Sequence, residues 1–116
     1  MPYIIDENDR RQQLKTGSIA ENAGELNFKI FSYVKDCLAR NLNPNSKIIK
    51  VYVDQFLGST PNYQRYNDMT GCLIRCQKEI QRRLGQQAKI LFRIMESYDF
   101  EISEYEDKKI EENGDV

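Results

Sequence analysis

The sequence predicts an all-α protein, a small helical bundle formed by a single domain of residues 1–116. Apolar residues recur at steps of three and four along most of the chain, which is the spacing of an amphipathic helix. Glycine, proline and asparagine separate the segments that have this spacing. A chain of 116 residues has the length of one domain and can bury a modest core.

Residues 1–17 are predicted to form an N-terminal arm or a short helix. Asp6 suits the cap of that helix, and Gly17 ends it. Ser18 and Glu21 have the spacing of a capping box, so a second helix should follow. The apolar stripe of this second helix comprises Ala23, Leu26, Ile30, Phe31, Val34, Cys37 and Leu38. A proline and three asparagines then end it.

Residues 47–57 have two interpretations. The run from Ile48 to Val53 is rich in β-branched residues, which favours a strand by propensity. Apolar residues nevertheless recur at helical intervals, and no partner strand is evident for a lone strand. The helical positions are Ile49, Tyr52, Val53, Phe56 and Leu57. We therefore predict a helix that begins near Ser46, with a strand as the alternative.

The strongest periodic signal predicts one long amphipathic helix over about 62–97. Thr60 suits an N-cap and Pro61 suits the first helical turn. The apolar positions are Tyr66, Met69, Leu73, Cys76, Ile80, Leu84, Ala88, Leu91 and Met95. At ~1.5 Å per residue the helix is on the order of 45 Å long. That length predicts pairing with another chain in a homo-oligomer, while Gly71 and Gly85 are positions where the helix bends or breaks.

The C-terminal residues 101–116 are predicted to form an acidic tail that docks onto the rest of the protein. They contain seven acidic and two basic residues, whereas the first 100 residues contain 15 basic and 11 acidic ones. Residues 98–102 alternate and fit a short extended segment or a helix end. A last helix over 104–112 should end at Asn113 and Gly114. Docking within one chain and docking between chains both fit this charge pattern.

Composition argues against catalysis. The chain has no histidine, so Ser-His-Asp and Cys-His catalytic sets are absent. No glycine-rich loop resembles a nucleotide-binding turn, and no cofactor is expected. The three cysteines are expected to be reduced, buried and free of metal, because no histidine joins them. We predict a protein that is not an enzyme, and a metal enzyme built on Glu106 and Asp107 is the remote alternative.

Hydropathy and charge also bound the location and the partners. No stretch is long and apolar enough to span a membrane, and the N-terminus lacks the basic start and apolar run of a signal peptide. The predicted location is therefore the cytoplasm. A sequence pI of about 5.5 is low for a dedicated binder of duplex nucleic acid, so that class is not expected.

A basic section of the predicted long helix has two interpretations, a site for a small anionic ligand and a face that receives the acidic tail. Six basic residues and one acidic residue fall between positions 75 and 93: Arg75, Lys78, Glu79, Arg82, Arg83, Lys89 and Arg93. Guanidinium groups grip phosphate in a fork geometry. Rings that can stack against a base are offered by Tyr63, Tyr66, Tyr98 and Tyr105. The interpretation that we favour is that this basic face receives the acidic tail, because the surplus of +4 in the first 100 residues nearly balances the −5 of the tail.

Several short motifs point to a family when they are taken together. The chain begins Met-Pro-Tyr-Ile and carries Gly-Glu-Leu-Asn at 24–27. It has the pattern Tyr-x-x-x-Asn-Asp-x-x-Gly-x-Leu over 63–73, followed by Arg82-Arg83, and it ends Tyr-Glu-Asp-x-Lys-Ile-x-Glu-Asn-Gly-Asp-Val. In these motifs it resembles a family of small uncharacterised phage and prophage proteins. The resemblance implies a phage or prophage origin and a mainly helical fold, with no assigned activity.

In that setting, by analogy, we predict a phage accessory binding protein that counters host defence. Its target is an anionic nucleotide signal, such as a cyclic nucleotide, or a host protein. An oligomeric interaction or assembly module without a small-molecule ligand is the alternative. The residues assigned to the nucleotide are Arg82, Arg83, Lys108 and Lys109 for phosphates, Tyr105 for stacking, Asn67 and Asn113 for base or ribose edges, and Asp115.

Overall fold

The computed structural model describes residues 9–85 and 89–114, and these residues form helices joined by short connections. The helices are α1 (Arg10–Lys15), α2 (Ala23–Ala39), α3 (Ser46–Leu57), α4 (Tyr63–Leu84), α5 (Lys89–Ser97) and α6 (Asp99–Asn113). The predicted all-α bundle is confirmed. Asp6 lies outside the described residues.

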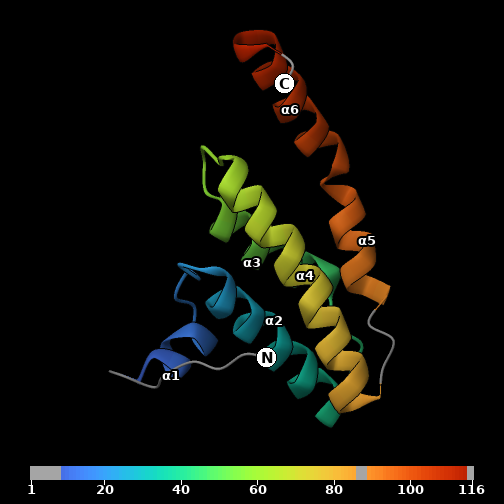
Figure 1. The fold of residues 1–116 in the computed structure, drawn as a ribbon. Helices are drawn as coiled ribbons and strands as arrows, with labels where there is room; N and C mark the ends of the chain where they lie inside the picture. Colours follow the sequence, from blue (N-terminus) through green and yellow to red (C-terminus); the bar gives the residue numbers. More distant parts are fainter. Residues whose placement is uncertain (1–8, 86–88, 115–116) are drawn as a thin grey trace.

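Helix α4 is the centre of the bundle. It packs against α2, α3 and α5, while α1 packs against α2. Figure 1 shows α5 returning antiparallel to α4, and α6 continuing upward until its far end lies beyond the bundle. The molecule is consequently elongated, with extents of 49 × 33 × 22 Å.

One continuous apolar core joins α2, α3, α4 and α5. Its fully buried side chains include Leu26, Ile30, Ile49, Val53, Met69, Leu73, Cys76, Ile80 and Leu91. The cysteines are buried and unpaired, as the sequence predicts. Burial raises the pKa of the Cys72 thiol to about 12, so this side chain acts as a small apolar group.

Residues 46–57 are helical, which confirms the interpretation based on periodicity. The apolar face of α3 is buried in the core and outweighs the β-branched composition of the run. The caps differ from the expected ones. Asn22 caps α2 and accepts the backbone N–H of Glu25 at 2.9 Å, in place of the predicted Ser18 and Glu21 box. Asn45 and Asn62 cap α3 and α4 in the same manner.

The structure corrects the predicted helix over 62–97, which is divided into α4 and α5. Gly85 ends α4 in the left-handed conformation, at φ +66°, which glycine adopts without steric cost. Antiparallel α5 buries Leu91 and Ile94 against the same core that α4 faces. A hairpin of helices therefore preserves the spacing of threes and fours that a continuous helix would show.

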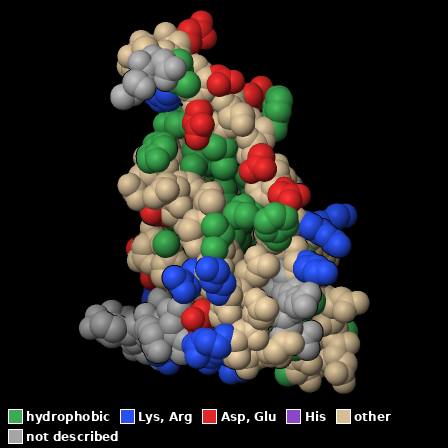
Figure 2. Space-filling model, turned by 45° about the vertical axis from the view of Figure 1, so that its right-hand side comes forward, with side chains coloured by type: hydrophobic (Ala, Val, Ile, Leu, Met, Phe, Trp, Pro, Cys, Tyr) green, Lys and Arg blue, Asp and Glu red, His purple; other side chains and the backbone are tan. Residues whose placement is uncertain are grey.

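Helix α6 has no buried residue along its length. Ile102 and Tyr105 are partly buried against the core, whereas the residues from Glu106 to Gly114 are exposed. Figure 2 shows most acidic side chains of one face in its upper part, along α6, and most basic ones lower down. Within one chain, the far half of the tail thus extends away from the basic end of α4.

Candidate functional site

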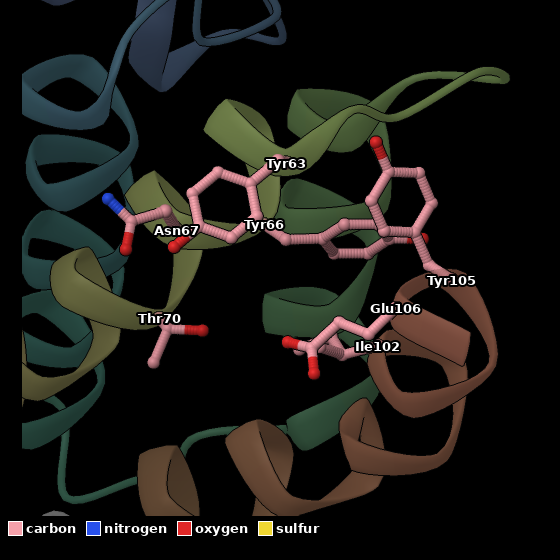
Figure 3. A pocket seen from close by; sticks show the side chains of 7 residues that line it. All are labelled: Tyr63, Tyr66, Asn67, Thr70, Ile102, Tyr105 and Glu106. Atoms are coloured by element: carbon pink, nitrogen blue, oxygen red, sulfur yellow. The ribbon is translucent and has the colours of Figure 1, made fainter. Parts of the chain in front are cut away.

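A pocket of about 140 Å³ lies where the start of α4 faces the first half of α6. Figure 3 shows side chains from the two helices on opposite sides of it. Its lining residues are Tyr63, Tyr66, Asn67, Thr70, Ile102, Tyr105 and Glu106. We call it the tyrosine pocket.

The α4 wall follows from helical spacing. Tyr66 and Asn67 follow Tyr63 by three and four positions, and Thr70 follows them by four and three. The four residues therefore share one face of the helix. Asn62 fixes the start of that face, because its side chain accepts the backbone N–H of Arg65 at 2.9 Å. The two tyrosines differ in burial. Tyr66 is 6% exposed and forms the pocket's inner wall, whereas Tyr63 is 64% exposed at its rim.

The α6 wall is held in place by Tyr98, which joins α5 to α6. Tyr98 is 4% exposed, and its hydroxyl donates a hydrogen bond to Asp54 on α3. The Lys50 ammonium, also on α3, lies 5.6 Å from the centre of the Tyr98 ring. This anchor fixes the direction in which α6 leaves the bundle. Ile102 and Tyr105 then fall on the helix face that looks toward α4.

Tyr66 and Tyr105 form the contact that closes the pocket. Their ring centres are 5.2 Å apart and their planes are inclined at 56°, an arrangement typical of aromatic pairs. The Tyr66 hydroxyl donates to Glu101 Oε1 at 3.1 Å. Burial, together with this hydrogen bond to a carboxylate, raises the pKa of Tyr66 to about 12. The phenol therefore stays neutral at physiological pH.

The electrostatic character of the tyrosine pocket is negative. Glu106 is in its lining, and Glu101 is bound to Tyr66 beside it. No lysine or arginine is among the lining residues that the structure describes. The Lys109 ammonium lies 5.7 Å from the centre of the Tyr105 ring and 3.6 Å from a Glu112 carboxylate oxygen. Tyr105 thus already attracts a cation of its own chain.

Of the predicted nucleotide contacts, the structure brings only Asn67 and Tyr105 together in this pocket. Asn67 stands at its edge, and Figure 3 shows its amide pointing away from the rings toward α2. Lys108, Lys109 and Asn113 lie on the exposed far half of α6. Asp115 lies outside the described residues.

The two predicted arginines lie at the other end of α4. Arg82 is 15 residues from Asn67, which places it about 22 Å away along the helix axis. It donates to Glu79 at 2.8 Å and is an exposed partner in that ion pair. Arg83 lies over the Phe31 ring at 4.7 Å. One chain therefore does not assemble these arginines with Tyr105 around a single ligand.

Arg83 belongs to a separate basic groove of about 320 Å³. This basic groove is lined by Arg11, Lys15, Phe28, Phe31, Ser32, Lys35, Asp36 and Arg83. Its residues come from α1, α2 and α4. Sequence reasoning grouped the basic residues between positions 75 and 93, which lie on α4 and α5, so it did not identify the contribution of α1 and α2.

Sequence reasoning identified the tyrosines but not the complete pocket. Thr70 and Ile102 were not predicted, because each is an ordinary residue of an amphipathic helix. Glu106 was considered only as a metal ligand or part of a solvated acidic face. A signal for α6 does exist in the spacing of Ile102, Tyr105 and Glu106, which places them on one face. That spacing does not predict which helix this face of α6 packs against.

No protein-family model, curated protein or solved structure matched this chain in the comparisons. Among the helices that the structure describes, none combines the length and the apolar character needed to cross a membrane.

Proposed function

We propose that this chain is a non-enzymatic binding protein that holds a protein partner by a lysine or arginine side chain in the tyrosine pocket. The observation that carries the proposal is the lining itself. Three tyrosine rings and one carboxylate surround a space of about 140 Å³. The lining that the structure describes has no basic residue. In the phage setting that the motif resemblance implies, the partner is a host protein.

Ring electrostatics favour a cationic group. The face of an aromatic ring is electron-rich, and a cation within about 6 Å of its centre gains roughly 0.5–2 kcal/mol. Glu106 adds a full negative charge at the same place. The position of Lys109 over Tyr105 is an example of this attraction within the chain. An ammonium or guanidinium head thus finds both a ring face and a counter-charge.

Size and charge argue against a nucleotide in this pocket. Sites for drug-sized ligands are roughly 300–1,000 Å³, so the tyrosine pocket suits one side-chain head better. A phosphate would meet Glu106 and Glu101 without a balancing cation in the described lining. The basic groove has the charge for an anionic ligand, but it lacks Tyr105 and Asn67.

The groups of the pocket also suit binding better than catalysis. A proton donor or acceptor for chemistry near neutral pH needs a pKa close to that range. The pKa of Tyr66 is instead raised to about 12, further from neutral pH than that of an ordinary tyrosine.

The proposal is tested by NMR titration with n-butylammonium, the head of a lysine side chain. We expect shifts of the backbone amides around Tyr66 and Tyr105, with binding in the millimolar range. Replacing Tyr105 with alanine should weaken binding about 5–10-fold, because one ring face is lost. Phe100→Ala is the matched control. Phe100 is also an aromatic residue of α6, but it is 74% exposed and outside the pocket lining.

The control is expected to keep the wild-type affinity. Equal losses in Tyr105→Ala and Phe100→Ala would show that α6 itself, and not the pocket, is responsible. Shifts confined to residues outside the pocket would contradict the proposal.

A further inference from the structure

A second concavity adjoins the tyrosine pocket and is not used by the proposed function. It lies between the first turns of α2 and the middle of α4 and has a volume of about 370 Å³. Its polar and glycine residues are Gly24, Asn27, Asn67, Asp68, Gly71 and Arg75. Asn67 lines both spaces, so the two are neighbours at this residue. We call this second space the amide groove.

Asn27 is the unusual residue of the amide groove. It lies on α2 and is 6% exposed, yet its Oδ1 atom accepts no hydrogen bond from any described residue. A buried polar atom without a partner is costly, so most such atoms in folded proteins are paired. Asn27 is one of the residues that line the amide groove, so a rotation about its χ2 angle would turn this oxygen toward the groove. A ligand with a matching group would satisfy it.

Gly71 keeps the α4 side of the groove open. Nothing lies within 4 Å of the position that a Cβ atom would take at Gly71. A Cβ at Gly24 would come within 3.3 Å of the Asn22 oxygen that caps α2. The backbone of α4 is therefore accessible at Gly71, whereas the Asn22 side chain occupies the space beside Gly24. Figure 3 shows that the Asn67 amide points toward α2 and away from the tyrosines.

The chemistry of this lining selects a ligand class. A side-chain amide can donate to and accept from another amide at the same time. A peptide main chain offers such pairs, and so does the edge of a nucleobase. Recognition of unpaired bases in proteins relies on aromatic stacking as well. No aromatic side chain lines the described part of the amide groove, which favours the peptide.

We infer that the amide groove binds main-chain amide groups of an extended segment of the partner, next to the basic side chain that enters the tyrosine pocket. Asn27 and Asn67 would each pair with a peptide unit, and Gly71 would let the strand approach α4. Asp68 already accepts a hydrogen bond from Gln64 at 2.7 Å, which holds its carboxylate at the groove wall. The inference rests on the proposed function, because it assigns the rest of the same ligand.

The test compares two probes that share the lysine head. N-acetyl-Ala-Lys-Ala-amide has main-chain amides on both sides, whereas n-butylammonium has none. On the wild-type protein, the peptide should shift amides of both the tyrosine pocket and the amide groove, and n-butylammonium only those of the pocket. Asn27→Leu, which keeps the number and branching of the side-chain heavy atoms, should lower peptide affinity about tenfold and leave n-butylammonium affinity unchanged.

Gly71→Leu is a second variant, chosen so that a loss of peptide binding cannot be explained by a loss of stability. Its backbone is helical without a positive φ, and its side chain would enter open space, so the helix should be stabilised. We expect its thermal midpoint to be at or above that of the wild type, while peptide binding falls to the level of n-butylammonium. Leucine at this position fills the space that the strand would occupy.

The outcomes separate the two proposals. If n-butylammonium binds but the peptide binds no better and shifts no groove amide, the inference is wrong and the proposed function stands. If the peptide shifts groove amides while n-butylammonium does not bind, the proposed function fails. If adenosine shifts the groove amides and the peptide does not, the ligand class is wrong. Unchanged peptide affinity in both Asn27→Leu and Gly71→Leu overturns the inference outright.

Discussion

Tyr98→Ala should lower the free energy of unfolding by about 3–5 kcal/mol, the range for removing a large buried aromatic side chain. Tyr98 is 4% exposed and packs in the core, and its hydroxyl bonds to Asp54 across the junction of α3 with α5 and α6. Its loss leaves a cavity where α6 leaves the bundle. Denaturation followed by circular dichroism measures the effect.

The same substitution should abolish binding to the tyrosine pocket. Tyr105 faces Tyr66 only while α6 keeps its direction, and Tyr98 is the residue that fixes that direction. Tyr98→Phe is the matched control, because it keeps the ring and removes only the hydroxyl. We expect it to cost about 1 kcal/mol and to retain most of the binding. A Tyr98→Phe variant as unstable as Tyr98→Ala would mean that the hydrogen bond, and not ring burial, anchors α6.

Glu25→Gln should destabilise the protein by about 1–2 kcal/mol at neutral pH. Glu25 on α2 joins this helix to α1 through an ion pair with Arg10. Both of its carboxylate oxygens accept from the Arg10 guanidinium, at 2.8 and 2.5 Å, and one also accepts the backbone N–H of Glu21 at 3.0 Å. Because the pair is partly buried, solvent screens it less than a surface ion pair.

The stabilisation by Glu25 should depend on pH in a defined direction. The Arg10 hydrogen bond, above all, lowers the pKa of this carboxyl below its ordinary value of 4.5, although burial opposes the shift. A carboxyl with a lowered pKa in the folded state stabilises the protein above its unfolded pKa. That stabilisation is lost as the pH falls through the folded pKa. The difference between wild type and Glu25→Gln should therefore shrink below pH 4.5.

Glu79→Gln is a suitable comparison for this pH dependence. The pKa of Glu79 is also lowered, chiefly by its hydrogen bond to Arg82, but Arg82 is 66% exposed. Solvent weakens such a pair, so the effect of Glu79→Gln should be smaller than that of Glu25→Gln. If the difference in the free energy of unfolding between wild type and Glu25→Gln persists at low pH, Glu25 stabilises the protein by packing rather than by charge.

Periodicity was sufficient to predict most of the fold. The apolar stripe of α2 and the helical spacing of Ile49, Val53 and Phe56 reflect faces that are in fact buried. The division at Gly85 was harder to predict, because α4 and α5 bury their stripes in one core and so preserve the same spacing. A glycine indicates where a helix can break, but the gain from packing α5 against α4 decides that it does.

The site was less predictable than the fold. Tyrosines at 63, 66 and 105 were recognised as ring faces, but sequence cannot show that α6 returns Tyr105 to the start of α4. The basic section and the acidic tail were paired on total charge alone. In the structure the exposed half of α6 points away from the end of α4. The last turn of α4 contains Arg82 and Arg83. Total charge contains no information about the direction in which α6 leaves the bundle. That direction depends on the contacts of Tyr98.

The central claim is that the tyrosine pocket recognises positive charge, and a neutral analogue tests it most directly. N-acetyl-Ala-Lys-Ala-amide and the same peptide with norleucine differ only in the ammonium group at the end of the side chain. We predict that the lysine peptide binds about tenfold more tightly in NMR titrations, through the rings and Glu106. Equal affinities for the two peptides would contradict the account and identify the pocket as merely apolar.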